Sequence, residues 1–434
     1  MNISVFGTGY VGLVMGAGLA NLGHQVICVD VNAQKINQIQ QGKIPFYEPG
    51  LKELVAQTKE KGKLRFITNV QEGVTSADII LNCVGTPSRN NGAADLTFVF
   101  QVAETVARYA QGQKLLINKS TVPPGTAKQC SELIQKINPI SGLEVISNPE
   151  FLAEGKAVYD FNHPDKIVVG ANSDRAFALV RKMYMGRMRT YIPFLETDWE
   201  TAEMIKYANN CFLATKISFV NEIANICDKV GANFKVVAQA MGMDYRIGPK
   251  FLNAGVGYGG SCFPKDVRAL IAVAEEKGYE PALLREVDML NERQKKILLQ
   301  KITHKFNGQL PGKVFTIWGA SFKPQTSDVR EAPSLVLIRE LLEKGARIKV
   351  YDPVALEELR QVFGDAVSYC SSIADSVAES SSVILLTEWD EFRTVNFQEL
   401  AKVMKEKVIF DGRNIYEPEL IQEEGFEYYG IGRS

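Results

Sequence analysis

The residues of this chain that most clearly suggest chemistry lie in the segment GYGGSCFPKD, at positions 257–266. Cysteines are usually buried among apolar neighbours, whereas Cys262 follows a run of glycines and precedes Pro264 and Lys265. Pro264 suits the first position of a helix that continues as PKDVRALIAVAEEKG, which places Cys262 just outside a helix N-terminus. The helix dipole and Lys265 would both favour a thiolate there, so we interpret Cys262 as a nucleophile. The alternative is a cysteine with a purely structural role.

A second candidate site is the glycine-rich segment GTGYVG, which follows a predicted strand and opens a predicted helix. In such a segment Gly7 allows a tight turn, Gly9 lets the backbone approach a pyrophosphate, and Gly12 lets the helix pack on the strand. Asp30 lies at the end of the next predicted strand, where a carboxylate accepts hydrogen bonds from a free ribose 2′-OH and repels a 2′-phosphate. The segment therefore predicts an NAD site. A glycine-rich turn that binds nothing is the alternative.

Together these sites suggest an oxidation in two stages. Hydride transfer turns an alcohol into an aldehyde, a thiolate captures the aldehyde as a thiohemiacetal, and a second hydride transfer gives a thioester that water cleaves to an acid. Lys206 and Asn210 are four residues apart on a predicted helix and are candidates to stabilise the oxyanions, although an exposed polar stripe would have the same spacing. Thr121 and Glu150 lie on predicted loops after strands, where Glu150 could act through water.

Strand-like and helix-like runs alternate at both ends of the chain, which predicts an α/β fold with two Rossmann-like, doubly wound domains. The order KVFTIWGASF, a helix over about 332–344, and ARIKVYDP repeats the order of the first 30 residues, and Asp352 stands where Asp30 stands. Chance similarity between two βαβ units would leave this fold class unchanged. The second unit lacks the glycine fingerprint. Its first loop carries Lys323 and Arg330, which suit a diphosphate that is not a cofactor or, alternatively, a solvated charged loop.

The middle of the chain is predicted to be helical. The stretch from 197 to 231 runs for about 30 residues without a break, which corresponds to a helix about 45 Å long. Thr197 and Glu200 have the spacing of a capping box, and Gly231 suits the end of the helix. A long helix of this kind can join the two domains. Apolar residues around much of its circumference predict a helical dimerisation region and a homodimer: Phe212, Ile217, Phe219, Val220, Ile223 and Ile226.

Composition sets outer limits on function. The chain has 434 residues and a formal net charge of −1, so two or three domains are expected and no global field favours nucleic acid or an anionic membrane. Seven cysteines without CxxC pairs and three scattered histidines argue against a disulfide framework or a metal site. The apolar N-terminal stretch lacks the basic region of a targeting signal, so we expect a cytoplasmic protein. We expect packing for Cys28, Cys83, Cys211 and Cys227, and Cys130 and Cys370 have no activating neighbours.

Seven motifs occur in an order that resembles one family closely. They are GTGYVG, STVPPGT, NPEFLAEG, KYANN, RIGPKFLNAGVGYGGSCFPKD, the FKP…DVRE loop and DGRN. The chain resembles the UDP-glucose/GDP-mannose dehydrogenase family, and within it the bacterial UDP-glucose 6-dehydrogenases, over nearly its whole length. This resemblance implies an NAD-binding domain at 1–196, a central helical dimerisation domain at 197–300 and a UDP-sugar-binding domain at 301–434.

The resemblance also implies a reaction: two-step NAD-dependent oxidation of the C6 alcohol of UDP-glucose to UDP-glucuronate. GDP-mannose 6-dehydrogenase, with the same chemistry, is the nearest alternative. A single-step hydroxyacid dehydrogenase that uses Lys206, with Cys262 dispensable, and a non-catalytic NAD-sensing scaffold are the others.

Residue roles follow from the same resemblance. Cys262 resembles the thioester nucleophile, and Lys206, Asn210 and Asp266 resemble groups that handle the oxyanion and water. Thr121 and Glu150 resemble the pair that positions and activates water. The implied cofactor contacts are Gly7, Gly9, Tyr10, Val11, Gly12, Asp30, Lys35, Thr86, Thr121, Glu154, Lys265 and Arg330. The implied substrate contacts are Glu150, Phe151, Leu152, Glu154, Lys206, Asn210, Phe251, Leu252, Asn253, Gly259, Lys323 and Arg413, with Arg246 reaching the neighbouring subunit's site.

Overall fold

Residues 1–185 and 192–433 are described by a computed structural model. The chain divides into two compact units. The first comprises Met1–Asn209 and Arg268–Tyr279, and the second comprises Asn210–Val267 and Glu280–Ser434. Residues 197–300 are therefore shared between the units, and the three domain boundaries stay a prediction.

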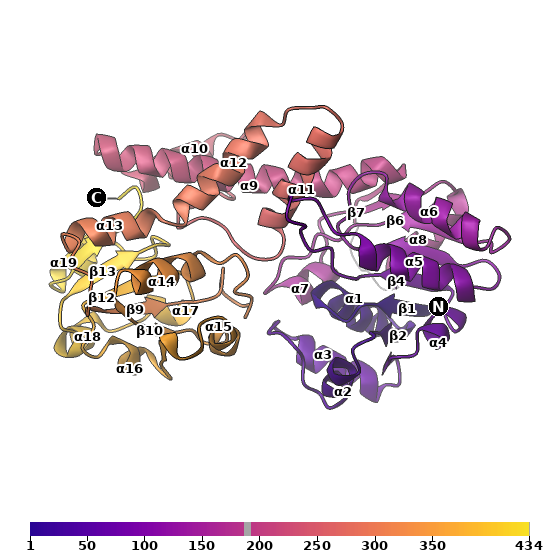
Figure 1. Ribbon diagram of the computed structural model, residues 1–434, viewed down its shortest axis with the longest axis horizontal. Helices are drawn as coiled ribbons and strands as arrows, with labels where there is room; N and C mark the ends of the chain where they lie inside the picture. The colour runs from indigo at the N-terminus through magenta and orange to yellow at the C-terminus, as the bar shows by residue number, and fades with distance from the viewer. Residues whose placement is uncertain (186–191, 434) are drawn as a thin grey trace. The chain divides into compact units, whose positions relative to one another are not determined.

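The first unit is built on an eight-stranded sheet in the order β3-β2-β1-β4-β5-β6-β7-β8, parallel except between β6 and β7 (Figure 1). Its first six strands follow the Rossmann order, as the alternating pattern predicted. Apolar residues of α1, α3 and α7 pack into one core cluster and those of α4, α5 and α6 into another. The strands are β1 (Asn2–Phe6), β2 (Gln25–Val29), β3 (Leu64–Ile67), β4 (Ile79–Asn82), β5 (Leu115–Asn118), β6 (Glu144–Ser147), β7 (Ile167–Gly170) and β8 (Phe194–Thr197). The helices are α1 (Tyr10–Asn21), α2 (Ala33–Gln40), α3 (Leu51–Glu60), α4 (Val70–Thr75), α5 (Thr97–Tyr109), α6 (Thr126–Ile137), α7 (Ala157–Asn162) and α8 (Asp174–Met185).

The second unit has a parallel six-stranded sheet in the order β11-β10-β9-β12-β13-β14, again the Rossmann order. The prediction of two α/β domains is confirmed. The strands are β9 (Val314–Trp318), β10 (Arg347–Tyr351), β11 (Ser368–Tyr369), β12 (Ser382–Leu385), β13 (Val408–Asp411) and β14 (Glu427–Tyr429). The helices are α10 (Phe234–Met243), α12 (Ala282–Gln294), α13 (Ile297–Lys305), α14 (Pro333–Glu343), α15 (Leu356–Phe363), α16 (Ile373–Val377), α17 (Asp390–Arg393), α18 (Phe397–Val403) and α19 (Pro418–Glu423), and helix α11 (Phe263–Glu276) continues into the first unit.

The first turn of each sheet has the same geometry, which supports the internal repeat. Gly7 has a φ of +93° and its N–H donates to the carbonyl of Val29 at 2.8 Å. Gly319 has a φ of +85° and its N–H donates to the carbonyl of Tyr351 at 2.9 Å. A Cβ at Gly319 would collide with Thr387, so this turn admits no larger residue.

The two acids of the repeat differ in what they bind. Asp352 is buried, and one of its carboxylate oxygens accepts the N–H groups of Ala320 and Ser321 at 2.7 and 3.2 Å. The other oxygen accepts the N–H groups of Val354 and Ala355 at 3.0 and 2.9 Å. Asp352 is thus committed to holding its own turn together, whereas the carboxylate of Asp30 remains partly exposed.

Helix α9 (Trp199–Val230) contains 32 residues and joins the two Rossmann-like units. Its predicted C-terminus is confirmed: Gly231 has a φ of +73°, and Ala232 donates to the carbonyl of Cys227 at 3.1 Å. The predicted capping box is wrong. Thr197 is the last residue of β8, and the carboxylate of Asp198 instead accepts the N–H of Thr201 at 2.7 Å. Neither α9 nor another helix within 1–185 and 192–433 is long and apolar enough to cross a membrane.

The commitment of Asp352 to backbone donors predicts a large effect of its amide. Asp352→Asn replaces one acceptor oxygen by an NH₂ group and leaves two buried N–H groups without a partner. We expect the free energy of unfolding to fall by about 2 to 5 kcal/mol, measured by urea denaturation. Asp365→Asn removes the same charge from an exposed position of the second unit and should change it little. Equal unfolding free energies for the two variants would contradict this account.

Candidate active site

Two glycines of the turn at the start of α1 have different roles, one in packing and one beside open space. A Cβ at Gly12 would collide with the carbonyl oxygen of Gly7, so Gly12 is required by the fold. A Cβ at Gly9 would have no heavy atom within 4 Å, so the space beside Gly9 is open. Gly9 caps α1, and its carbonyl accepts the N–H of Leu13 at 2.9 Å. This open cradle at a helix N-terminus fits the pyrophosphate of a dinucleotide.

Asp30 is held rigidly at the end of β2. Its Oδ2 accepts the N–H and hydroxyl of Thr8 at 2.9 and 2.7 Å and the ammonium of Lys35 at 3.0 Å. Burial acts to raise the pKa of Asp30, but the hydrogen bonds from Thr8, Asn32 and Lys35 outweigh it and the pKa lies below its ordinary value. A fixed, ionised carboxylate in this place suits the free 2′-OH of NAD and opposes the 2′-phosphate of NADP.

Other predicted cofactor contacts also lie around this turn. The hydroxyl of Thr86 donates to the carbonyl of Thr121 at 3.0 Å. The hydroxyl of Tyr10 donates to the carboxylate of Glu48 and accepts the N–H of Gly155 at 2.8 Å. The hydroxyl of Tyr10 therefore links the start of α1 to Gly155. The preceding residue, Glu154, is buried. Val11 is partly buried against the core cluster that contains α1, α3 and α7.

Glu150 and Lys206 form a buried ion pair. Their side chains are 7% and 5% exposed, and Nζ lies 3.4 Å from Oε1. The second oxygen of Glu150 accepts the N–H of Leu152, and the ammonium of Lys206 lies 5.2 Å from the centre of the Phe151 ring. Asn210 is also buried, so the exposed polar stripe considered for this part of α9 is wrong. The candidate oxyanion group and the candidate water-activating group are in direct contact.

Lys119 is a charged residue of this region that the sequence did not single out. It follows β5 and is buried, and its ammonium donates to Asn148 Oδ1 at 3.2 Å and to the hydroxyl of Tyr184 at 3.0 Å. Burial lowers the pKa of Lys119 to about 8, although the nearby Cys83 and Glu150 act to raise it. Its position between a buried strand and Thr121, in the segment NKST, is the signal that could have drawn attention to it.

Cys262 lies immediately before α11, as predicted. Its carbonyl accepts the N–H of Asp266 at 2.9 Å, the first hydrogen bond of the helix. Pro264 occupies the second position of α11 rather than the predicted first, because Phe263 already has helical geometry. Cys262 is partly exposed, and its sulfur lies 3.6 Å from the hydroxyl oxygen of Ser261.

The other cysteines are all buried, which confirms the packing role expected for four of them. Burial raises the pKa of Cys83, Cys130 and Cys211 to about 12. It raises the pKa of Cys28 and Cys370 as well. Buried thiols of this kind are poor nucleophiles, so Cys262 stands apart in its exposure.

The glycines before Cys262 have a packing role besides the access that we expected. A Cβ at Gly259 would lie 2.5 Å from the carbonyl oxygen of Glu331. Gly260 has a φ of +81°, and a Cβ there would lie 2.7 Å from the ring of Phe322. The N–H of Gly260 donates to the carbonyl of Arg330 at 2.8 Å. The cysteine loop is therefore packed against the loop that follows β9.

Asp266 organises the first turn of α11. It is buried, its Oδ2 accepts the amide of Asn210 at 2.6 Å, and its Oδ1 pairs with the ammonium of Lys265. Lys265, which we expected to favour the thiolate of Cys262, thus shares its charge with a carboxylate. The helix N-terminus remains a source of positive potential beside Cys262 that is independent of Lys265.

Three predicted substrate contacts, Leu252, Asn253 and Arg413, line one cavity of about 630 Å³ in the second unit. Arg413 is fixed by the carbonyls of Leu386 and Phe322, at 2.8 and 2.9 Å. Two further cations, Lys235 and Arg433, line the cavity, and both pair with Glu417. The remaining lining residues of the cavity are Phe234, Ala238, Gln239, Gly242, Met243, Pro249, Ala254 and Asn414.

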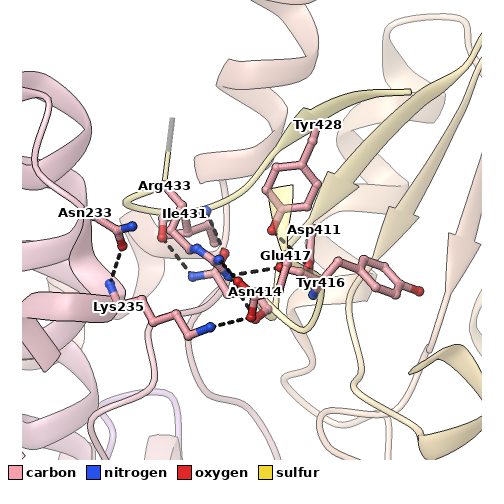
Figure 2. A network of polar contacts seen from close by, with 9 residues as sticks. All are labelled: Asn233, Lys235, Asp411, Asn414, Tyr416, Glu417, Tyr428, Ile431 and Arg433. Atoms are coloured by element: carbon pink, nitrogen blue, oxygen red, sulfur yellow. Dashed lines mark hydrogen bonds and ion pairs between the residues drawn. The ribbon is translucent and has the colours of Figure 1, made fainter. Parts of the chain in front are cut away.

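One wall of this cavity is held by the network drawn in Figure 2. The side chain of Asn414 exchanges two hydrogen bonds with the backbone of Ile431, at 2.8 and 2.9 Å. The buried guanidinium of Arg433 donates to the carbonyl of Tyr416 at 3.0 Å and to Glu417 at 2.7 Å, and Lys235 pairs with the other oxygen of Glu417. The network joins α10, the loop after β13 and the last described residues of the chain.

Other predicted contacts are not among the residues that line this cavity. Arg246 and Arg330 have exposed side chains that pair with Asp244 and Asp328. Phe251 is exposed and has a φ of +65°. The ammonium of Lys323 lies 5.4 Å from the centre of the Phe322 ring.

The three parts of the chain match three domains of one known family. Residues 1–187 match the NAD binding domain of the UDP-glucose/GDP-mannose dehydrogenase family, residues 200–293 its central domain, and residues 316–418 its UDP binding domain. The chain belongs to the UDP-glucose/GDP-mannose dehydrogenase family. Its cofactor is accordingly NAD, in agreement with the geometry of Gly9 and Asp30.

Individual members of this dehydrogenase family match the chain over its full length. A UDP-glucose 6-dehydrogenase of Bacillus subtilis is 43% identical over 435 residues, which cover 100% of this chain and 98% of that protein. The structure of a UDP-glucose dehydrogenase from Pyrobaculum islandicum superposes with a TM-score of 0.92 at 36% identity and covers 100% of this chain and 98% of that one. A GDP-mannose dehydrogenase from Pseudomonas aeruginosa gives a TM-score of 0.55 at 31% identity, covering 99% and 100% of the two chains.

The different surroundings of Gly9 and Gly12 predict different defects. Gly9→Ala should leave the unfolding midpoint close to that of the wild type but weaken NADH binding at least tenfold, because the methyl group enters the open cradle. Gly12→Ala should destabilise the first unit by about 1–3 kcal/mol or more, because its methyl group meets backbone. Fluorescence titration with NADH and urea denaturation measure the two effects. NADH binding by Gly9→Ala as tight as that of the wild type would refute the assignment of the cradle.

Proposed function

We propose that this protein oxidises the C6 alcohol of UDP-glucose to the carboxylate of UDP-glucuronate in two NAD-dependent steps. The observation that carries the proposal is the partly exposed Cys262 at the N-terminus of α11, in a chain whose other six cysteines are buried. Full-length similarity to proteins named UDP-glucose 6-dehydrogenase supports the choice of substrate.

Each group in the chain then has a defined task. NAD, when bound, accepts a hydride in each oxidation. Lys206 and Asn210 stabilise negative charge on the substrate oxygen, first in the alkoxide and later in the tetrahedral intermediates. The thiolate of Cys262 donates an electron pair to the aldehyde carbon and forms the C–S bond of a thiohemiacetal, while the carbonyl electrons move to the oxygen.

The second oxidation turns the thiohemiacetal into a thioester, which water must cleave. Glu150 takes a proton from this water and Thr121 orients it, so that the C–S bond breaks and Cys262 is restored as a thiolate. Asp266 acts by holding the amide of Asn210. The balance is one sugar nucleotide, two NAD⁺ and one water giving one carboxylate, two NADH and three protons.

The cavity lined by Leu252, Asn253 and Arg413 is our candidate for the nucleotide end of the substrate, since it combines cationic and amide groups. Lys323 is assigned to the diphosphate. The remaining predicted contacts are proposed in two groups. Those to the substrate are Phe151, Leu152, Glu154, Phe251 and Gly259. Those to NAD are Tyr10, Val11, Lys35, Thr86, Lys265 and Arg330. The boundaries 1–196, 197–300 and 301–434 are proposed as the functional domains.

GDP-mannose is the substrate that an assay must separate from UDP-glucose. NADH formation with UDP-glucose, GDP-mannose and UDP-N-acetylmannosamine, measured side by side, distinguishes them. Sequence identity of 43% to a UDP-glucose 6-dehydrogenase, against 31% to a GDP-mannose dehydrogenase, supports UDP-glucose. A higher kcat/KM with either other nucleotide would change the assignment.

We further infer a homodimer that works in the cytoplasm. Phe212, Phe219 and Ile226 are 66%, 49% and 50% exposed, and their spacing of seven residues places them on one stripe of α9. An exposed apolar stripe of this kind supports a second copy of the chain as its partner. Val220, which we also expected at the interface, is buried within the second unit. None of the seven cysteines forms a disulfide, which is usual for a reducing compartment.

The stoichiometry of the reaction tests the role of Cys262. Wild-type protein should form two NADH for each UDP-glucose consumed, without free aldehyde. Cys262→Ala should bind NADH normally and form no UDP-glucuronate, while Cys262→Ser should accumulate an ester, because an alkoxide leaves less readily than a thiolate; mass spectrometry detects this adduct. Cys370→Ala is the matched cysteine control and should retain activity. UDP-glucuronate formation by Cys262→Ala at the wild-type rate would overturn the mechanism.

The apolar stripe predicts the effect of charge on assembly. Phe212→Glu combined with Phe219→Glu should convert the dimer to monomer in sedimentation velocity, because burying two carboxylates at an interface costs several kcal/mol. Leu420→Glu, at an exposed position of α19, should leave the sedimentation coefficient unchanged. A wild-type protein that sediments as an active monomer would refute the dimer.

A further inference from the structure

The C-terminal end of α12 grips the segment that leads to Cys262. The buried side chain of Asn291 accepts the N–H of Tyr258 at 2.8 Å and donates to its carbonyl at 3.0 Å. The buried side chain of Gln294 donates to the carbonyl of Gly255 at 2.7 Å. Two side-chain amides, less than one helical turn apart, therefore fix the backbone of residues 255–258.

Lys295, the next residue, reaches a different loop. Its side chain is 1% exposed, and its ammonium lies 2.8 Å from a carboxylate oxygen of Glu292 and 3.1 Å from one of Glu331. A buried ammonium is tolerated because carboxylates compensate its charge. Glu292 belongs to the same helix, whereas Glu331 lies on the loop that follows β9.

Glu331 has an uncommon backbone conformation, with a φ of +53°. The left-handed region costs a residue with a Cβ free energy, so surrounding contacts must hold it. The ion pair with Lys295 is such a contact. If it were lost, we expect the peptide on either side of Glu331 to relax toward an ordinary conformation.

That peptide is the surface on which the cysteine loop rests. The carbonyl of Arg330 accepts the N–H of Gly260 at 2.8 Å, and Gly259 packs so closely on the carbonyl of Glu331 that a Cβ would not fit. Gly260 is two residues before Cys262. The conformation of residues 330–331 therefore sets where the nucleophile stands at the N-terminus of α11.

We propose that Lys295 is a positioning residue for Cys262. Through Glu331 it fixes the peptide that supports Gly259 and Gly260, while Asn291 and Gln294 fix the preceding part of the same loop. The end of α12 thus holds the cysteine loop from both sides. The same contact fixes the backbone of Arg330, a proposed NAD contact. This inference rests on the proposed role of Cys262 as the nucleophile.

The two carboxylates bound to Lys295 provide a matched pair of variants. Glu331 and Glu292 are 44% and 45% exposed, and Glu331→Gln and Glu292→Gln each remove one negative charge beside the same ammonium. We expect Glu331→Gln to lower kcat at least tenfold, approaching the roughly 10²-fold loss that a misplacement of about 1 Å can cause. Glu292→Gln should stay within about twofold of the wild type. Equal losses in the two variants, or no loss in either, would overturn the proposal.

Alkylation of Cys262 gives a second readout that needs no substrate. The rate of reaction with iodoacetamide is followed against pH in the full-length protein, and peptide mass spectrometry identifies the labelled cysteine. Glu331→Gln should move the midpoint of this profile to higher pH, since the thiol leaves its place at the N-terminus of α11. Glu292→Gln should reproduce the wild-type profile. A wild-type profile for Glu331→Gln would refute positioning even if kcat fell.

Failure of the proposed function is distinguishable from failure of this inference. If the wild-type protein oxidises no sugar nucleotide, the function is wrong, and the alkylation profiles still decide whether Glu331 positions Cys262. Lys295→Met should reproduce Glu331→Gln, and Lys295→Arg should restore part of the kcat because it keeps the charge. Urea denaturation identifies a variant that does not fold, and in that case the pair of glutamine variants decides.

Discussion

Glu150 and Lys206 are both removed from water, and a charge buried without a partner would cost several kcal/mol. The same requirement recurs at other buried charges of this protein. Asp266 is satisfied by Asn210 and Lys265, Lys119 by Asn148 and Tyr184, and Lys295 by two glutamates. Lys265 and Glu292 lie beside the residues they pair with, on the same helix, whereas the other partners come from a different loop or helix. Pairing of these charges therefore also fixes loops and helices of one unit against each other. Burial of charge thus supplies the rigidity on which positioning depends.

The two Rossmann-like units show how one turn serves two purposes. In both, a glycine with positive φ ends the first strand and an acid ends the second. In the first unit the cradle beside Gly9 is open and Asp30 is partly exposed, so the turn can receive a dinucleotide. In the second unit Asp352 is buried and bonded to four backbone N–H groups of its own turn and the following loop. The residues of that unit that we propose to bind substrate, Lys323 and Arg413, lie on neighbouring loops instead.

The features that local sequence predicted are those that local chemistry determines. The glycine fingerprint, Asp30, the end of α9 at Gly231 and the place of Cys262 before α11 each depend on residues a few positions apart. Lys119 and Lys295 were missed because their significance lies in burial and in partners such as Tyr184 and Glu331, which are 65 and 36 residues away. The predicted N-cap of α9 was wrong because Thr197 pairs with Gly170 as part of strand β8 and so cannot cap the helix. The role of Arg433 in the cavity wall could not be predicted for the same reason. Its contacts with Tyr416 and Glu417 form only because the segment after β14 folds back against the loop after β13.

The burial of six thiols has a consequence for how this protein meets an oxidant. Peroxide attacks thiolates that it can reach, and thiols whose pKa is raised by burial react slowly. Damage therefore concentrates at Cys262, where the first product is a sulfenic acid that reducing thiols reverse. None of the seven cysteines forms a disulfide, so the fold has no disulfide to lose when it is reduced again. With Cys262 as the proposed nucleophile, oxidation would stop the activity of the protein while leaving its buried core largely unchanged.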